Sequence, residues 1–281
     1  MAVPAPLSLM AAIAVGQSAV MVLAWAIQRA TRQSGWVDAC WSLAMGLGGV
    51  TAALAPLALA PLESTPPSAR QVLVATLVGL WAGRLGLHIA ARTRGGGDDP
   101  RYAQLLQDWG PRAPMRLFLF LQSQAVAAAL LTATVFVAAR NPAPGLGVAD
   151  GVGVLVLLAG VLGEGMADAQ LARFRRRPDA HGGVCDAGLW AWSRHPNYFF
   201  EWVGWLAYPC FALAPGMDGP WPWGWVALTG PAVMYGLLVH VSGIPPLEAH
   251  MARSRGQAFE AYRRRTSAFF PWPPGRSGIT E

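Results

Sequence analysis

Long apolar runs dominate the chain, and short polar stretches separate them. A helix that crosses a membrane needs about 20 mostly apolar residues. Stretches that approach this length lie near residues 7–28, 37–58, 70–91, 116–139, 150–171, 197–214 and 221–243. The sixth is short and bounded by prolines, so we expect it to tilt or to be partly broken. The pattern predicts an all-α, polytopic membrane helical bundle with about seven transmembrane helices.

The first apolar run has no positively charged segment before it, and its length is close to that of a membrane span. We therefore interpret it as a first spanning helix rather than a cleaved signal. Neither an internal repeat nor a soluble segment is visible in the pattern. We expect residues 1–281 to form a single transmembrane domain.

Composition supports a membrane protein, and the placement of arginine predicts its orientation. Hydrophobic residues make up 54% of the chain, charged residues make up 13%, and the mean hydropathy is +0.35. All 21 basic residues are arginine, and most follow the first, third, fifth and seventh runs. Because arginine favours cytoplasmic flanks, the N-terminus is predicted outside and the C-terminus in the cytoplasm. Interfacial arginine also explains the net charge of +6 without a nucleic-acid partner.

The start of the sixth run carries the densest group of polar side chains. Arg194 and His195 precede Pro196, which suits the first turn of a helix. Exposed amides at such a helix start, beside two cations, would suit a phosphate. Asn197 and Glu201 are four residues apart and face the same side of that helix. A charged cap at the membrane interface is the alternative, although a cap has no need of this amide and carboxylate.

Ionisable and polar groups inside apolar runs are candidates for function. Those in the second and third runs are candidate catalytic residues, and those of the fifth run are candidate cofactor ligands. By the predicted topology they lie toward the cytoplasmic half, where they could converge on the start of the sixth run. Internal ion pairing, for example between Asp168 and Arg175, is the alternative for each set. The candidates are Asp38, Trp41, Arg84 and His88, followed by Glu164, Asp168 and Arg175.

The C-terminal stretch 259–272 is basic and aromatic, and follows further arginines such as Arg255. A helix on the membrane surface would explain it. A tyrosine beside arginines, as at Tyr262 and Arg263, also suits a nucleotide, because a ring can stack on the base while the charges bind phosphate. The three cysteines show no spacing typical of a metal site, and we expect no bound metal.

Residues 193–202 together with 262–271 resemble the steroid 5-alpha-reductase-like membrane family, in particular a bacterial branch whose substrates are mostly unassigned. The resemblance covers about residues 150–272 most specifically. It implies seven transmembrane helices in a bacterial inner membrane, NADPH held at the cytosolic side by the 150–272 half, and reduction of a carbon–carbon double bond conjugated to a ketone. The expected substrate is an apolar, steroid-like or other lipid molecule, and we expect a monomer.

The resemblance also implies roles for individual residues. Asn197 matches the partner of the nicotinamide amide, and Glu201 matches the acid one turn later. Asp168 and Arg175 match polar positions near the nucleotide, and Tyr262 matches the tail tyrosine at the cofactor. The expected cofactor-binding set is completed by Glu164, Arg194, His195, Tyr198, Arg255 and Arg263.

One departure from the family pattern concerns the substrate ketone. The steroid enzymes grip the ketone with a Gln-Glu pair in the second span and a tyrosine from the third. This chain has no such pair, and Asp38 is the single acid of its second run. A protonated Asp38 would donate to the oxygen on which charge develops, because burial in an apolar bundle favours the neutral carboxyl. Trp81 takes the place of the tyrosine.

Two other classes of function stay open at this stage. Membrane methyltransferases of the isoprenylcysteine type share an Arg-His-Pro-x-Tyr stretch and bind S-adenosylmethionine, which has no phosphates. The reductase is favoured over the methyltransferase by the arginines, which are suited to binding phosphate, and by Asn197 and Glu201. A transporter or scaffold is less favoured, because many transporters show paired hydropathy repeats.

Overall fold

The computed structural model describes residues 5–57, 66–95, 99–180, 182–215 and 221–274. Over these residues the chain is helical, and its one feature of β type is an isolated bridge between Ser193 and Ser267. Six helical stretches are long and apolar enough to cross a membrane: Ala5–Thr31, Gly35–Leu54, Ala69–Arg94, Arg101–Ala139, Val148–Arg175 and Pro222–Arg255. The prediction of a polytopic, all-α membrane protein is confirmed in this form.

The chain divides into two compact units, which are described one at a time. Unit 1 comprises residues 1–154 and 207–233, and unit 2 comprises residues 155–206 and 234–281. The main helices of unit 1 are α1 (Ala5–Thr31), α2 (Gly35–Leu54), α3 (Ala69–Arg94), α4 (Pro100–Trp109), α5 (Ala113–Ala139), α8 (Ala207–Ala212) and α9 (Thr229–Tyr235), the last continuing two residues into unit 2. Those of unit 2 are α7 (Pro196–Trp205), the π-helix Gly236–Val241, α10 (Ile244–Arg255) and α11 (Gln257–Arg265). Helix α6 (Val148–Arg175) begins in unit 1 and continues into unit 2.

Glycines of α2 allow α3 to pack against it at short range. A Cβ atom at Gly46 would collide with the Cβ of Ala82, and one at Gly49 would lie 2.9 Å from the side chain of Val78. Gly86 of α3 is equally close to Leu43. Small residues at a helix interface let the two backbones approach each other. The glycine cluster of the second run therefore serves helix packing.

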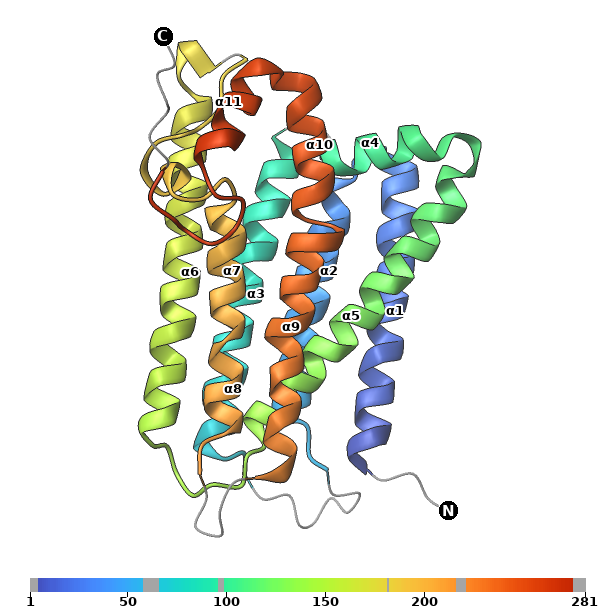
Figure 1. The fold of residues 1–281 in the computed structure, drawn as a ribbon. Coiled ribbons are helices and arrows are strands. Elements are labelled where there is room, and N and C mark those ends of the chain that lie inside the picture. Colours follow the sequence, from blue (N-terminus) through green and yellow to red (C-terminus); the bar gives the residue numbers. More distant parts are fainter. Residues whose placement is uncertain (1–4, 58–65, 96–98, 181, 216–220, 275–281) are drawn as a thin grey trace. The chain divides into compact units, whose positions relative to one another are not determined.

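Helices α1 and α5 pack against this α2–α3 pair. Helix α5 crosses obliquely over α1 and α2 (Figure 1). Trp25 of α1 donates from Nε1 to the Pro114 carbonyl at 2.9 Å and meets Phe118 edge to face. Within the apolar interior, Gln17 donates to Thr132 at 2.8 Å. Such polar contacts between helices fix their register where apolar packing alone would allow sliding.

In unit 2, α7 begins at Pro196 as the sequence predicts, with proline in the first helical turn. It packs closely against α6: a Cβ at Gly160 would lie 2.6 Å from the Gly204 nitrogen, and one at Gly163 would collide with Phe200. The predicted sixth span is broken, because α7 ends at Trp205 and α8 begins at Ala207. Pro209 explains the break, since it has no N–H for the Trp205 carbonyl and its ring crowds that oxygen.

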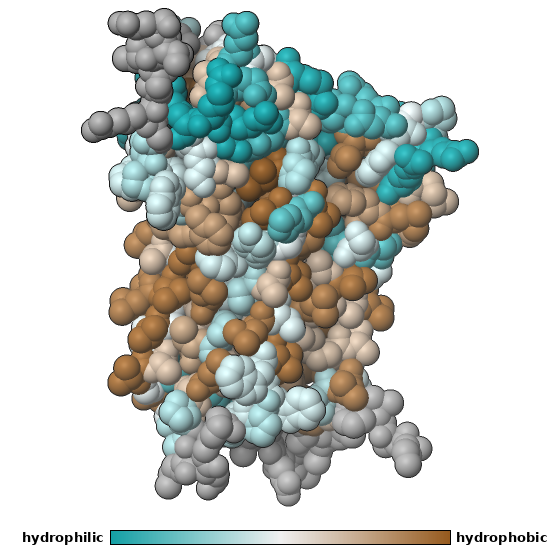
Figure 2. Space-filling view, viewed as in Figure 1, coloured by the Kyte–Doolittle hydropathy of each residue, from teal (hydrophilic) through white to brown (hydrophobic). Residues whose placement is uncertain are grey.

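The surface of the helices has the pattern that a membrane requires. Hydrophobic side chains cover the middle of the helices, and hydrophilic ones gather around α4 in unit 1 and around α11 in unit 2 (Figure 2). Large apolar side chains that are at least half exposed occur along several of the long helices, including Leu23, Leu47, Leu80, Leu119 and Leu162. Exposed apolar surface of this kind is stable in lipid rather than in water.

Candidate functional site

The start of α7 in unit 2 is joined to the C-terminal tail by backbone and side-chain hydrogen bonds. The Arg194 N–H donates to the Ser267 carbonyl at 2.8 Å. The Ser193 hydroxyl, which is fully buried, donates to the Phe269 carbonyl at 2.8 Å. The Trp272 N–H donates to the Trp192 carbonyl at 2.9 Å. We call this connection, between residues 190–195 and residues 262–272, the tail clamp.

Arg194 is the central cation of the tail clamp. Its side chain is 9% exposed, and its Nε donates to Oε1 of Glu248 at 2.8 Å. Its Nη1 donates to the carbonyls of Thr266 and Arg263. Planar guanidinium groups suit this simultaneous contact with a carboxylate and backbone oxygens. Arg194 was predicted as a phosphate ligand, and the structure places it in contacts within the protein.

His195 and Tyr262 also belong to the tail clamp. The Nε2 of His195 lies 3.0 Å from Oε1 of Glu248, and its ring stacks on Tyr198 with centroids 5.5 Å apart. Burial lowers the pKa of His195, and the neighbouring Glu248 opposes that effect. The Tyr262 hydroxyl donates to the Trp190 carbonyl, and burial raises its pKa. These residues therefore have a structural role, and contact with a cofactor stays a prediction for them.

Helices α6 and α7 each carry two of the predicted polar residues, and one pair of them is in contact. Asn197 donates from Nδ2 to Oδ1 of Asp168 at 3.4 Å. Glu164 lies one turn before Asp168 on α6, Glu201 lies one turn after Asn197 on α7, and both are buried. Glu201 accepts from the Trp205 indole N–H at 3.0 Å. We call the predicted set Glu164, Asp168, Asn197 and Glu201 the α6–α7 polar ladder.

The remaining arginines predicted for the cofactor lie in three helices of unit 2, with Arg255 at the end of α10, Arg263 in α11 and Arg175 at the end of α6. Arg255 has a buried Nε with no hydrogen-bond partner among the described residues. Arg263 forms an ion pair with Glu260 at 3.0 Å and is half exposed. Arg175 is exposed at the end of α6. An unpaired buried guanidinium nitrogen is a donor suited to a phosphate oxygen.

Unit 1 contains a second polar cluster, built around Asp38 at the start of α2. The carboxylate of Asp38 accepts from the guanidinium of Arg101 and, at 2.8 Å, from the hydroxyl of Tyr102. Arg101 also pairs with Asp99 at 2.9 Å, and Gln124 of α5 donates to the Tyr102 oxygen at 3.4 Å. We call these five residues the Asp38 cluster.

The surroundings of Asp99 in the Asp38 cluster favour its ionised carboxylate. Burial would raise the pKa of Asp99, but the hydrogen bonds and charge of Arg101, with Arg92 adding to them, hold it below its usual value. Both oxygens of Asp38 act as acceptors toward Arg101 and Tyr102. In the structure Asp38 is thus an acceptor toward two donors, and the donor role that the sequence predicted for it stays a prediction.

The other predicted catalytic residues of unit 1 are placed differently. Trp41 packs beside the Asp38 cluster and donates from Nε1 to the Gln124 carbonyl at 3.1 Å. Near the end of α3, Arg92 pairs with Asp99 at 3.2 Å. His88 is exposed, and Arg84 is partly buried. Trp81 is buried, in keeping with a packing role.

Sequence reasoning missed Arg101, Tyr102 and Gln124. Arg101 was counted among the arginines that set the orientation, and Tyr102 and Gln124 were not noticed. The available signal was local: Asp99 followed by a proline is a typical helix start, and its side chain does cap α4 through the Arg101 N–H at 3.0 Å. A helix lying across the link would have brought these side chains near the start of the second span.

The fold and these polar groups define a polytopic α-helical membrane protein with ionisable clusters inside its helical units. A family model described as a protein of unknown function, DUF1295, matches residues 24–266. The chain belongs to this family, which is steroid 5-alpha-reductase-like. No curated protein and no solved structure matches the chain. The matched range includes every residue of the tail clamp up to Thr266, the α6–α7 polar ladder and the Asp38 cluster.

Proposed function

We propose that the protein is a membrane-embedded, NADPH-dependent reductase of a carbon–carbon double bond conjugated to a ketone in an apolar substrate. The observation that carries the proposal is the contact between Asn197 and Asp168, found in a chain of a steroid 5-alpha-reductase-like family. Both residues match cofactor positions of the resemblance, and they meet in the structure although 29 residues separate them.

The α6–α7 polar ladder supports a site for the nicotinamide end of the cofactor. Asn197 uses one amide hydrogen on Asp168, and at 3.4 Å this bond is long. Its carbonyl oxygen would accept from the nicotinamide carboxamide, which fixes the ring face offered to the substrate. Arg255, with its unpaired buried Nε, is the best candidate among the arginines of unit 2 for a cofactor phosphate. A 2′-phosphate held by arginine would select NADPH over NADH.

The chemistry requires a hydrogen-bond donor in addition to the cofactor. The cofactor supplies a hydride to the β carbon, and negative charge then develops on the ketone oxygen. In the Asp38 cluster, the guanidinium of Arg101 is a donor group held by the Asp38 carboxylate, whereas the single O–H of Tyr102 is already donated to that carboxylate. We propose that Asp38 positions Arg101 as the donor, rather than donating from its own carboxyl group. Removing one such donor in other enzymes costs about 100- to 1,000-fold in rate.

The finer topology is part of the proposal. We take the broken pair α7 and α8 as one further span beside the six long stretches, which gives seven. The arginine distribution supports an N-terminus outside and a C-terminus in the cytoplasm. A monomer in a bacterial inner membrane completes the proposal, as the family resemblance implies. Reporter fusions at the two ends test the orientation, and both ends on one side of the membrane would contradict it.

A methyltransferase of the isoprenylcysteine type is the second candidate. The stretch from Arg194 to Tyr198 is shared with that class, and in the structure its histidine and tyrosine rings stack. S-adenosylmethionine has no phosphates and would leave Arg255 without a role. The reductase is preferred for this reason.

Enone-dependent oxidation of NADPH by the purified protein tests the proposal, with a 4-en-3-one steroid as the probe. Asn197→Ala should weaken NADPH binding, because loss of the amide removes a hydrogen bond worth about 1–3 kcal/mol. Asp38→Ala should lower the rate and leave NADPH affinity unchanged. Gln257→Ala, an exposed amide of unit 2, is the matched control. Normal turnover by both Asn197→Ala and Asp38→Ala would refute the assignment of these roles.

A further inference from the structure

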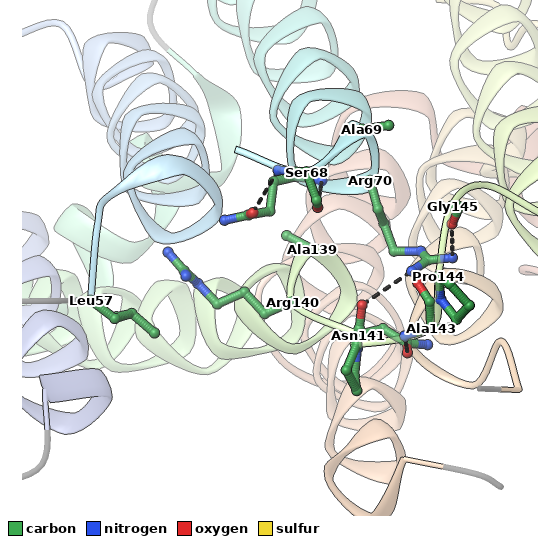
Figure 3. A pocket seen from close by; sticks show the side chains of 12 residues that line it. Leu57, Ser68, Ala69, Arg70, Ala139, Arg140, Asn141, Ala143, Pro144 and Gly145 are labelled. Atoms are coloured by element: carbon green, nitrogen blue, oxygen red, sulfur yellow. Dashed lines mark hydrogen bonds between the residues drawn. The ribbon is translucent and has the colours of Figure 1, made fainter. Parts of the chain in front are cut away.

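A cavity of about 470 Å³ lies at the end of unit 1 where α2 and α5 finish and α3 begins. Its wall is formed by residues 68–71 at the start of α3, by residues 139–145 after α5, and by Leu57 (Figure 3). None of these residues belongs to the Asp38 cluster or to unit 2. The cavity is therefore separate from every group used in the proposed function.

One side of the cavity is built by Arg70, which is almost completely buried. Its five N–H groups are all used: two donate to the two carboxylate oxygens of Asp150 at 2.8 Å, and three donate to the carbonyls of Asn141, Ala143 and Gly145. Asp150 cancels its charge. Arg70 thus fixes the shape of the wall and adds no net charge to the cavity.

Arg140 provides the charge of the cavity. Its Nε donates to the Ala52 carbonyl at 3.0 Å, its Nη2 donates to the Ala55 carbonyl, and its guanidinium lies over the Phe136 ring. Within the described ranges it contacts no carboxylate, and its Nη1 is not used in a hydrogen bond. Arg140 is partly buried, and this burial lowers its pKa. A cation that is partly withdrawn from water and contacts no carboxylate favours an anion nearby.

The start of α3 adds to the positive potential. Ser68 caps the helix by accepting from the Gln71 N–H at 3.2 Å, and the side chain of Gln71 accepts from the Ser68 N–H at 2.9 Å. The N–H groups of residues 69 and 70, also at the cavity, belong to the first turn of a 26-residue helix. The partial positive charge of such a helix start acts in the same direction as Arg140. The partial negative charges at the ends of α2 and α5 act in the opposite direction, so Arg140 remains the principal cation.

We propose that this cavity binds the phosphate of an anionic membrane-lipid headgroup, with Arg140 as the principal cation. Three membrane helices end at the cavity, so it lies at the depth where lipid headgroups are found. Leu57 and Pro144 give it apolar wall in addition to the cation. A free phosphate ion has the same chemistry, and the source is decided by experiment.

The test uses the full-length protein, freed of lipid in dodecyl maltoside, and follows its melting temperature. It is titrated with dihexanoyl phosphatidylglycerol, with dihexanoyl phosphatidylcholine and with sodium phosphate. We expect a saturable rise with phosphatidylglycerol and at least tenfold weaker binding of phosphatidylcholine, whose choline cation faces the same positive field. Arg140→Gln should weaken binding of phosphatidylglycerol at least tenfold. Arg116→Gln, an exposed arginine at the other end of α5, should leave it unchanged.

A second variant guards against a folding defect in Arg140→Gln, which loses its bonds to α2. Pro144→Asp places a carboxylate at an exposed position of the cavity wall and removes no hydrogen-bond donor. It should also weaken binding at least tenfold. If sodium phosphate raises the melting temperature in a way that depends on Arg140, and phosphatidylglycerol raises it no further, the anion site is supported and its ligand is a free phosphate ion. Equal binding of the two lipids, or binding that both cavity variants leave intact, overturns the proposal.

Discussion

Replacing Arg194 separates a structural role in the tail clamp from a role in holding the cofactor. Arg194→Gln removes the ion pair with Glu248 and the bonds to two carbonyls, and leaves a carboxylate that is 16% exposed without its guanidinium. Breaking a buried pair by removing one partner costs about 3–5 kcal/mol. Because Glu248 retains some contact with solvent, we expect a loss near the lower value, about 3 kcal/mol.

The assay is the melting temperature of the variant with and without NADPH. A loss of 3 kcal/mol corresponds to a fall of about 6–12 °C, taking about 2–4 °C for each kcal/mol in a chain of this size. NADPH should raise the melting temperature of the variant by as much as it raises that of the unmodified protein. Arg264→Gln, an exposed arginine of the same tail, is the control and should melt normally. An Arg194→Gln protein of normal stability that no longer responds to NADPH would refute the clamp and restore Arg194 as a phosphate ligand.

Two further predictions concern one buried ion pair and one buried histidine. Arg70→Ala should destabilise the protein by about 3–5 kcal/mol, because Asp150 is left buried and unpaired. Arg112 is exposed, so Arg112→Ala should leave the stability unchanged. Equal melting temperatures for the two variants would contradict the arrangement around the cavity. The folded-state pKa of His195 lies below its usual value because of burial, so the unfolded chain binds the proton more readily and stability should fall as the pH drops below about 6.5. His195→Gln should flatten the melting profile between pH 7.5 and 5, and an unchanged slope in that variant would assign the pH dependence to another group.

The sequence was most informative where local chemistry decides structure. Pro196 starts a helix because proline suits the first turn. The break of the sixth span follows from prolines that remove backbone donors. These features depend on residues close in the chain, so composition and spacing were enough to predict them.

The pattern of apolar and charged residues could not predict contacts between residues that are distant in the chain. Arg194 pairs with Glu248 across 54 positions, and Arg101 pairs with Asp38 across 63. A single sequence shows that such charges exist, but it does not show which of them meet. For this reason Arg194 was predicted to bind phosphate although an internal carboxylate and carbonyls occupy it. Asp38, for the same reason, was predicted to be a donor before its contacts with Arg101 and Tyr102 were known.

Differential stabilisation by nucleotides tests the central claim most directly. The purified protein is melted with NADPH, NADH and S-adenosylmethionine, each at a hundredfold excess over the dissociation constant of NADPH measured by titration. A ligand that binds the folded state at that excess adds about 2.7 kcal/mol to its stability. The account predicts the largest rise in melting temperature with NADPH, a smaller rise with NADH, and none with S-adenosylmethionine. A rise with S-adenosylmethionine and none with NADPH would contradict it.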